Sequence, residues 1–220
     1  MTRARALISK LAAGMLAPLA AWAILATVAV YRTHEARIEA DDFSREFVKL
    51  QVQKSGIDVV TSLVRKYHGS WRDYATPSNS ESPCGGNAEI ADFIFDNTWL
   101  HRLFLAPLTE YSATIYVKSD CVCFRSLGIW DTVERFTGVH IQEFSEAPAM
   151  HSFYSRLMLP KAVIVMDTHA PAEARAAAFS LNLDCLTKLR GCQDTREMAP
   201  AIWKNSHRVG PTLWKSQWDE

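Results

Sequence analysis

The pattern of hydrophobic and polar positions divides the chain into a long apolar stretch near its start and a mixed remainder. Residues 11–31, LAAGMLAPLAAWAILATVAVY, contain no charged side chain over 21 positions. At 1.5 Å per residue, a helix of this length crosses a hydrocarbon core of about 30 Å. The pattern therefore predicts one transmembrane helix over residues 11–31.

The charged residues on either side of this helix predict its orientation. Arg3, Arg5 and Lys10 precede it, whereas residues 32–46 contain five acidic against three basic side chains. Loops rich in Lys and Arg stay on the cytoplasmic side. We therefore expect residues 1–10 in the cytoplasm and everything after the helix outside it.

Two further observations bear on the compartment. The chain contains no Asn-x-Ser/Thr glycosylation acceptor, which favours a bacterial inner membrane and a periplasmic domain over a eukaryotic lumen. The uncharged run is longer than the apolar region of about 7–15 residues in a usual signal peptide, which favours an uncleaved signal anchor. A cleaved signal peptide is the alternative, because Ala21-Trp22-Ala23 offers small residues in a cleavage pattern.

Residues 32–68 are predicted to form one long amphipathic stem helix that continues out of the membrane. Its apolar residues recur at alternating four- and three-residue steps, and they are Ala36, Ala40, Phe43, Phe47, Leu50, Ile57 and Val64. This stripe has two interpretations. It packs on the chain's own domain, or it forms the seam of a parallel homodimer, which Lys54 and Thr61 within the stripe disfavour.

Residues 69–220 alternate between strand and helix patterns, which predicts a small α/β or α+β domain with a mixed sheet and flanking helices. The expected loop is 69–86, the expected helices are 87–105, 129–137 and 171–189, and the expected strands are 138–144, 161–168 and a hairpin over 112–127. Lys118-Ser119-Asp120 is the predicted hairpin turn. About 190 residues beyond the membrane suffice for one domain.

The charge balance argues against nucleic acid as a partner. The chain has 24 basic and 24 acidic residues, and the three N-terminal cations lie on the cytoplasmic side. Because the remainder is near neutral and has no basic run, nucleic-acid binding is not expected. The expected partners are membrane lipid around the N-terminal helix, a second copy through the stem helix, and an unidentified protein.

Five cysteines lie on the exported side, where disulfides persist. Cys185 and Cys192 are seven residues apart, beyond bonding distance on a continuous helix. Gly191 can end the helix in a left-handed turn and return Cys192 toward Cys185. We therefore expect a Cys185–Cys192 disulfide that stabilises the local structure.

The sequence does not determine the pairing of the other three cysteines uniquely. Cys121 and Cys123 alternate as i and i+2 on a predicted strand, so their side chains share a face and do not easily bond each other. Cys84, in the loop, is the natural partner for one of them, and the other is then a buried or free thiol. We assign the bridge to Cys121 and keep Cys123 as the candidate free thiol.

No catalytic, metal or cofactor site is expected. A Cys-x-Cys pair without a third ligand is a weak metal signal, and Asp167-Thr168-His169 after an apolar strand is explained by a helix cap. The chain has no G-x-S-x-G motif and no glycine-rich phosphate loop. Cys123 would form a thiol–imidazole pair with His140 or His169 only if the fold brought them together.

The order of features resembles a known family. An N-terminal span and a stem are followed by Pro83-Cys84 opening a helix and by a second cysteine in a hairpin, Cys121 or Cys123. This order resembles the CSS-motif periplasmic sensor domains of membrane-bound cyclic-di-GMP phosphodiesterases. The resemblance implies that the two cysteines pair and that their redox state is sensed. No EAL-type catalytic domain is seen here, so phosphodiesterase activity is not expected.

These observations favour a membrane-anchored periplasmic sensory or interaction domain that is stabilised by disulfides and responds to redox state. It is not expected to be an enzyme. One alternative is a periplasmic thiol-dependent or hydrolytic enzyme, which would need a cleft joining a spare cysteine to a histidine. The other is a scaffold subunit of an envelope assembly, which would need the stem and span to associate with partners.

Overall fold

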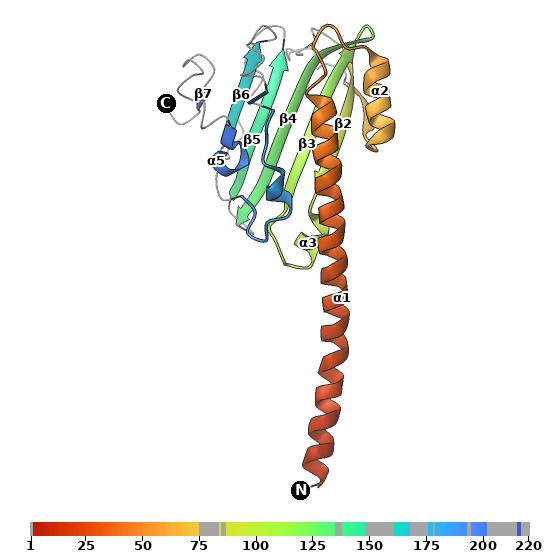
Figure 1. Cartoon of the computed structure of the whole chain (residues 1–220), viewed down its shortest axis with the longest axis vertical. Helices are drawn as coiled ribbons and strands as arrows, with labels where there is room; N and C mark the ends of the chain where they lie inside the picture. The colour runs from red at the N-terminus through yellow and green to blue at the C-terminus, as the bar shows by residue number, and fades with distance from the viewer. Residues whose placement is uncertain are drawn as a thin grey trace.

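The computed structural model of the chain describes most of the N-terminal two thirds and parts of the remainder. The described residues are 2–74, 84, 87–134, 138–147, 161–167, 176–177, 179–192, 195–201 and 215–216. A long N-terminal helix, α1 (Thr2–Phe47), runs down one face of a sheet and projects far beyond it (Figure 1).

The projecting part of α1 is apolar and uncovered. Among the described residues, α1 is the one helix long and apolar enough to cross a membrane, judged by length and composition. Its large hydrophobic side chains from Leu16 to Tyr31 are exposed, and Pro18 lies within it. Burial inside the domain therefore does not explain why this segment is hydrophobic. A core helix of a soluble protein would be covered.

The stem is two helices, so the expectation of one helix over residues 32–68 is wrong beyond Phe47. The chain turns after α1 and resumes as α2 (Ile57–Lys66). Gln53 adopts φ 65° within this turn, and its amide donates to the Val122 carbonyl at 2.7 Å. The turn thus bonds to the start of β4 (Cys121–Glu134) and reverses the chain, so that both helices cover the same face.

The stem's apolar stripe packs on the chain's own domain, as the first interpretation predicted. Ala40, Phe43, Phe47 and Leu50 are buried in the main core. These side chains are therefore not available for a homodimer seam. A homodimer through other surfaces of the stem stays a prediction.

In the part of the chain that the structure describes, seven strands form one sheet in sequence order, β1-β2-β3-β4-β5-β6-β7. They are β1 (Ser70–Tyr74), β2 (Ala88–Asp96), β3 (Thr109–Lys118), β4 (Cys121–Glu134), β5 (Gly138–Ala147), β6 (Lys161–Asp167) and β7 (Lys215–Ser216). All neighbours are antiparallel except β5 and β6, which are parallel. The expected mixed sheet with flanking helices is confirmed, and the fold is α+β.

Two expected helices are strands. Residues 87–105 form β2 and then only a short helix, α3 (Thr98–Arg102), and residues 129–134 continue β4. In β2, Ile90 packs on one face of the sheet and Phe93 on the other. Burial on both faces places apolar residues at spacings that imitate a helix, and pairing with β3 then decides the structure.

The remaining expected elements are confirmed in part. The hairpin β3–β4 turns at Ser119 and Asp120, whose φ angles of 51° and 61° define a two-residue turn with left-handed backbone. The expected strands over 138–144 and 161–168 appear as β5 and β6. β1 lies within the expected loop 69–86, of which residues 75–83, 85 and 86 lie outside the described part.

The expected helix over 171–189 does not continue to its end. Residues 171–175 lie outside the described part, and residues 176–177 are helical. The chain then leaves the helix and forms a 3₁₀ turn, η1 (Leu183–Leu186). A further short helix, α5 (Thr195–Met198), follows. The cysteine pair therefore sits in a compact turn rather than at the end of a long helix.

The main core lies between the helices and one face of the sheet. Phe43 of α1 is at its centre, with ring centroids 4.5 Å from Phe93, 5.4 Å from Phe95 and 5.2 Å from Tyr67. Aromatic pairs at these separations add attraction beyond area burial. The same helix that projects from the domain thus also fills its core.

Candidate functional site: the junction of the apolar helix with two disulfides

The end of α1 is held by a buried cation. Arg125 of β4 is 1% exposed, and its Nη1 donates to the carbonyl oxygen of Phe47 at 2.6 Å. Its guanidinium carbon lies 5.3 Å from the Phe47 ring centroid and 4.3 Å from that of Phe179. A cation at a helix C-terminus and over aromatic rings is doubly favourable. Arg125 therefore joins α1, the sheet and the C-terminal segment.

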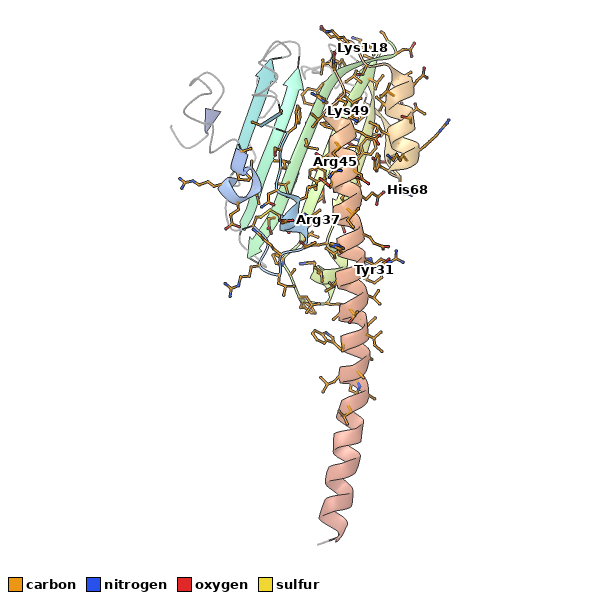
Figure 2. All side chains as sticks on the ribbon, viewed as in Figure 1. Tyr31, Arg37, Arg45, Lys49, His68 and Lys118 are labelled. Atoms are coloured by element: carbon orange, nitrogen blue, oxygen red, sulfur yellow. A yellow bond between two sulfur atoms is a disulfide. The ribbon has the colours of Figure 1, made fainter. Side chains whose placement is uncertain are left out.

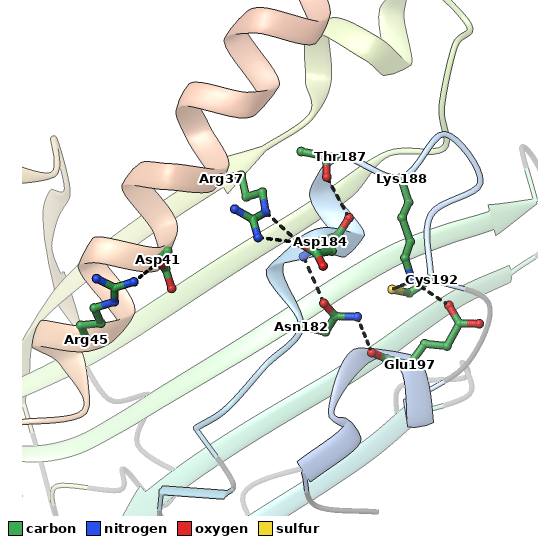
Figure 3. A network of polar contacts seen from close by, with 9 residues as sticks. All are labelled: Arg37, Asp41, Arg45, Asn182, Asp184, Thr187, Lys188, Cys192 and Glu197. Carbon is green, nitrogen blue, oxygen red and sulfur yellow. Dashed lines mark hydrogen bonds and ion pairs between the residues drawn. The ribbon is translucent and has the colours of Figure 1, made fainter.

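A second contact joins α1 to the C-terminal segment through Arg37. Arg37 donates from Nε and Nη2 to one carboxylate oxygen of Asp184, at 2.9 and 2.5 Å (Figure 3). Asp184 is in η1, where its amide donates to the Asn182 side chain. Asn182 in turn donates to the Glu197 carbonyl at 2.9 Å. The polar contacts thus run from α1 through η1 to α5.

The predicted disulfide Cys185–Cys192 is confirmed, and it closes this C-terminal turn. The two Cα atoms are 5.2 Å apart, and both residues are fully buried. Gly191 has φ +64°, as the predicted left-handed turn requires. A Cβ at Gly191 would also overlap the carboxylate of Asp131, so the position accepts only glycine without rearrangement.

Asp131 connects the disulfide-closed turn to the sheet. Its carboxylate accepts a short hydrogen bond from the backbone amide of Cys192, and its side chain is buried. Burial raises the pKa of Asp131 to about 6, and the nearby charge of Glu197 adds to the shift, whereas the Cys192 amide opposes it. The contact between sheet and turn therefore includes a group that titrates near neutral pH.

The second disulfide joins Cys84 to Cys123, with Cα atoms 5.5 Å apart. The expected bridge from Cys84 to Cys121 is therefore wrong, and so is the expected free thiol at Cys123. Cys121 is the free cysteine, and it is partly exposed. Cys123 therefore has no thiol to pair with His140 or His169 while the disulfide is formed.

A β-bulge explains why the pairing is reversed. Tyr116 pairs with Phe124 and Val117 with Val122, so Cys123 is an extra residue in β4. Val122 consequently packs in the main core, while Phe124, two residues on, packs on the opposite face. Strict alternation fails at such a bulge, and it brings Cys123 onto the face where Cys84 lies.

The Cys84–Cys123 bridge lies on the face of the sheet opposite α1. Both cysteines are partly buried against a small cluster that contains Ala88, Ile90, Tyr116 and Phe124. Lys118 donates from Nζ to the Cys84 carbonyl at 2.9 Å. The two disulfides therefore differ in environment, because this one is partly exposed whereas Cys185–Cys192 is enclosed.

A shallow groove lies between α1 and α2. It has a volume of about 330 Å³ and is lined by Glu35, Ile38, Glu39, Asp42, Lys66 and Tyr67. Lys66 forms a hydrogen-bonded ion pair with Glu46 at the same junction, which holds the pKa of Glu46 below its usual value. The groove is open and four of its six lining side chains are charged, unlike an enclosed small-molecule site.

Sequence reasoning missed Arg125, Asp131 and Asp184. Arg125 lies within a predicted strand and Asp131 within a predicted helix, and in both elements a charge predicts a solvent-facing position. Their burial depends on partners far along the chain, so no local signal identifies them. Among the described residues, no group of three or more His, Cys, Asp and Glu side chains could hold a metal ion. Asp167 ends β6, and Thr168 and His169 lie outside the described part.

No protein-family model, curated protein or solved structure matches the chain. The class of the protein therefore follows from its own features. An apolar N-terminal helix and two disulfides indicate a membrane-anchored protein whose domain lies in an oxidising compartment outside the cytosol.

Proposed function

We propose that this chain is a sensory or interaction module of the bacterial periplasm, anchored in the inner membrane by α1 with its N-terminus in the cytoplasm. One observation carries the proposal. A single helix runs from the apolar segment into the centre of the domain core, from Thr2 to Phe47. A module built this way links events in the domain to the membrane without a flexible linker.

The contacts of α1 support this role. Phe43 and Phe47 are core residues, and Arg125 binds the last carbonyl of the helix. Arg37 binds Asp184, the residue before the disulfide-closed turn. A shift in the sheet or in the C-terminal turn therefore changes the surroundings of α1 directly. Coupling between sites requires a physical element that both sites bias, and α1 is such an element.

The Cys84–Cys123 bridge is the proposed redox-responsive element. It is partly exposed, whereas Cys185 and Cys192 are fully buried. Exposed disulfides are the ones that thiols attack readily, and enclosed ones resist reduction. The CSS-motif sensor domains, which the order of features resembles, likewise pair a cysteine after the stem with one in a hairpin.

A redox titration of the full chain in lipid nanodiscs tests the proposal. A thiol reagent such as glutathione would reduce Cys84–Cys123 to two thiols and itself become a disulfide. Alkylation and peptide mapping then give the fraction reduced for each bridge. We expect Cys84–Cys123 to open at a less reducing potential than Cys185–Cys192, with the domain still folded.

The structural response to reduction of Cys84–Cys123 is measured on α1 itself. Hydrogen exchange should increase in β2, in the β3–β4 hairpin and at the C-terminal end of α1 when the first bridge opens. The variant C84A/C123A should reproduce this change under oxidising conditions, and C185A/C192A provides the matched control for loss of a buried bridge. Equal resistance of both bridges, or an unchanged α1, would contradict the redox-sensing role.

A further inference from the structure

One end of the sheet carries exposed apolar side chains from two separate loops. Trp99 and Phe104 are 51% and 74% exposed in the segment between β2 and β3, and Leu189 is 60% exposed in the disulfide-closed turn. Arg102 and Arg190 are exposed beside them in sequence. We call these five residues the end patch. Large exposed apolar side chains grouped at one place indicate a contact surface.

Pairing and hydrogen bonds place both loops at the same end of the sheet. Asn97 and Thr109, at the two ends of the first loop, bond to each other through backbone and side chain. Thr109 pairs with Asp131 across β3 and β4, and Asp131 accepts from Cys192 of the second loop. The two loops are therefore fixed against neighbouring strand ends.

The first loop is built to hold Phe104 outward. Asn97 is fully buried, and its side chain donates to the Pro107 carbonyl at 3.0 Å and accepts from the Thr109 amide at 2.8 Å. Phe104 has φ +61°, a backbone conformation that is costly for a bulky residue. This conformation closes the C-terminus of α3, where the Phe104 amide donates to the His101 carbonyl at 2.9 Å and the Leu105 amide to the Leu100 carbonyl at 3.0 Å. The loop therefore fixes the exposed Phe104 ring in one place.

This end of the domain lies where α1 leaves it toward the N-terminus. α3, which carries Trp99 and Arg102, contacts α1, and Figure 1 shows it beside α1 at the lower end of the domain. Ala29 and Thr33 of α1 are buried there. Figure 2 shows Tyr31 at the same level. The domain thus covers α1 as far down as the last turn of its uncharged run.

The length of that run fixes the height of the bilayer. About 20 residues cross the hydrocarbon core, and the run ends at Tyr31, before Arg32. A bilayer spanned by this run therefore has its headgroup layer around the last turn of the run, level with α3. Tryptophan and other aromatic rings favour this layer, and arginines there meet lipid phosphates.

We propose that the end patch docks on the outer surface of the same bilayer that α1 crosses, with Trp99, Phe104 and Leu189 in the headgroup layer and Arg102 and Arg190 against lipid phosphates. The domain then has two attachments to the membrane, α1 and the end patch, and its tilt is fixed. A protein partner at the patch is the alternative outcome of the test.

Spin-label accessibility in nanodiscs of phosphatidylethanolamine and phosphatidylglycerol tests this docking with the full chain. Single labels at F104C, L19C and V59C are made in a C121S background, which removes the free thiol. Leu19 reports on the apolar helix, and Val59, exposed on α2, is a matched apolar control away from the end patch. Each label is scored for collision with oxygen and with a water-soluble nickel chelate.

We expect the oxygen-to-nickel accessibility ratio at position 104 to be several-fold higher than at position 59 and to approach that at position 19. A ratio at 104 equal to that at 59, with 19 in lipid, overturns the docking but leaves the anchor intact. A water-exposed label at 19 overturns the anchor, and the docking with it. The two failures are therefore distinguishable.

A second variant tests whether the two aromatic rings hold the domain against the bilayer surface. A label at L189C is compared with and without the substitutions W99S and F104S. We expect lipid exposure at 189 to fall several-fold in the substituted chain, while mapping of both disulfides confirms the fold. An unchanged signal at 189 overturns the role of the two rings, and protection of 189 only when another protein is added overturns lipid as the occupant.

Discussion

The carboxylate of Asp131 is enclosed where β4 meets the disulfide-closed turn. It accepts a hydrogen bond from the Cys192 amide and lies against Gly191, and the charge of Glu197 contributes to raising its pKa. A second residue of this kind is Arg125, enclosed by aromatic rings at the end of α1. Both are side chains whose charge is tolerated in a protein interior only with matched partners. Small substitutions at either residue should therefore change the free energy of unfolding.

Stability should rise as the pH falls from about 7.5 to about 4.5. The pKa of Asp131 is raised to about 6 in the folded chain, so the folded state binds this proton more tightly than the unfolded state. The stabilisation is complete at pH below the unfolded pKa and is lost as the pH rises through about 6, by about 2–3 kcal/mol. Urea unfolding in detergent across this pH range measures it.

The variant D131N isolates this contribution, because its amide oxygen can still accept the Cys192 hydrogen bond. We expect the difference in unfolding free energy between D131N and the wild type to shrink as the pH falls below 6. The pKa of Glu110 is also raised by burial, and this comparison removes its contribution because both chains carry it. A constant difference across the range would show that Asp131 does not titrate there.

Replacement of Gly191 by alanine should destabilise the chain by at least about 1–2 kcal/mol. The position needs left-handed backbone at φ +64°, which costs an L-residue about that much, and the new methyl group must also displace the Asp131 carboxylate. D131N with G191A should not restore stability, since the amide is equally large. Wild-type stability of G191A would contradict the observed turn.

Replacement of Arg125 should weaken the attachment of α1. R125M keeps the apolar stem but loses the hydrogen bond to Phe47, which costs about 1.5–3 kcal/mol for a charged donor. R125A also loses packing between the two rings and should cost more. The control R72A removes an exposed ion pair with Asp92 and should cost less than about 1 kcal/mol. Denaturant unfolding compares the three, and equal losses would contradict the assigned role.

Local pattern was sufficient for some elements and failed for others. The apolar start of α1, the β3–β4 hairpin and the Cys185–Cys192 pair are set by short-range features, and all were predictable. β2 was mistaken for a helix, because a strand buried on both faces has no strict alternation. Cys123 was assigned wrongly, because a single bulge after Tyr116 changes which face each later residue meets.

Residues brought together from distant parts of the chain were beyond prediction. Arg37 meets Asp184 across 147 positions, and Arg125 meets Phe47 across 78. Each is an ordinary charged residue in its own segment. Only the packing of α1 against the sheet and the C-terminal turn gives these side chains their roles, and the sequence contains no local sign of that packing.

The two disulfides should contribute unequally to stability. Their cysteines are 39 and 7 positions apart, for which the chain-entropy model gives about 4 and about 2.5 kcal/mol. C84A/C123A should therefore lower the unfolding free energy more than C185A/C192A. Removal of the buried pair also leaves a cavity. A much larger loss for C185A/C192A would show that the cavity outweighs loop closure.

The molecule as a whole combines one long helix with one sheet domain. α1 is exposed and apolar where it leaves the domain and is core where it enters it. The main core therefore depends on the membrane-anchoring helix. A chain from which α1 is removed as far as Phe43 should unfold rather than yield a folded domain free of the membrane. The disulfides on opposite faces of the sheet hold the hairpin and the C-terminal turn around this shared core.

Non-reducing peptide mapping with thiol alkylation, on the full chain taken from membranes of intact cells, tests the central claim most directly. The account predicts Cys84–Cys123 and Cys185–Cys192 as the two bonded pairs, with Cys121 alone alkylated before reduction. Ready alkylation of all five cysteines would contradict a disulfide-stabilised domain outside the cytosol, and recovery of the chain in the soluble fraction would contradict its anchoring by α1.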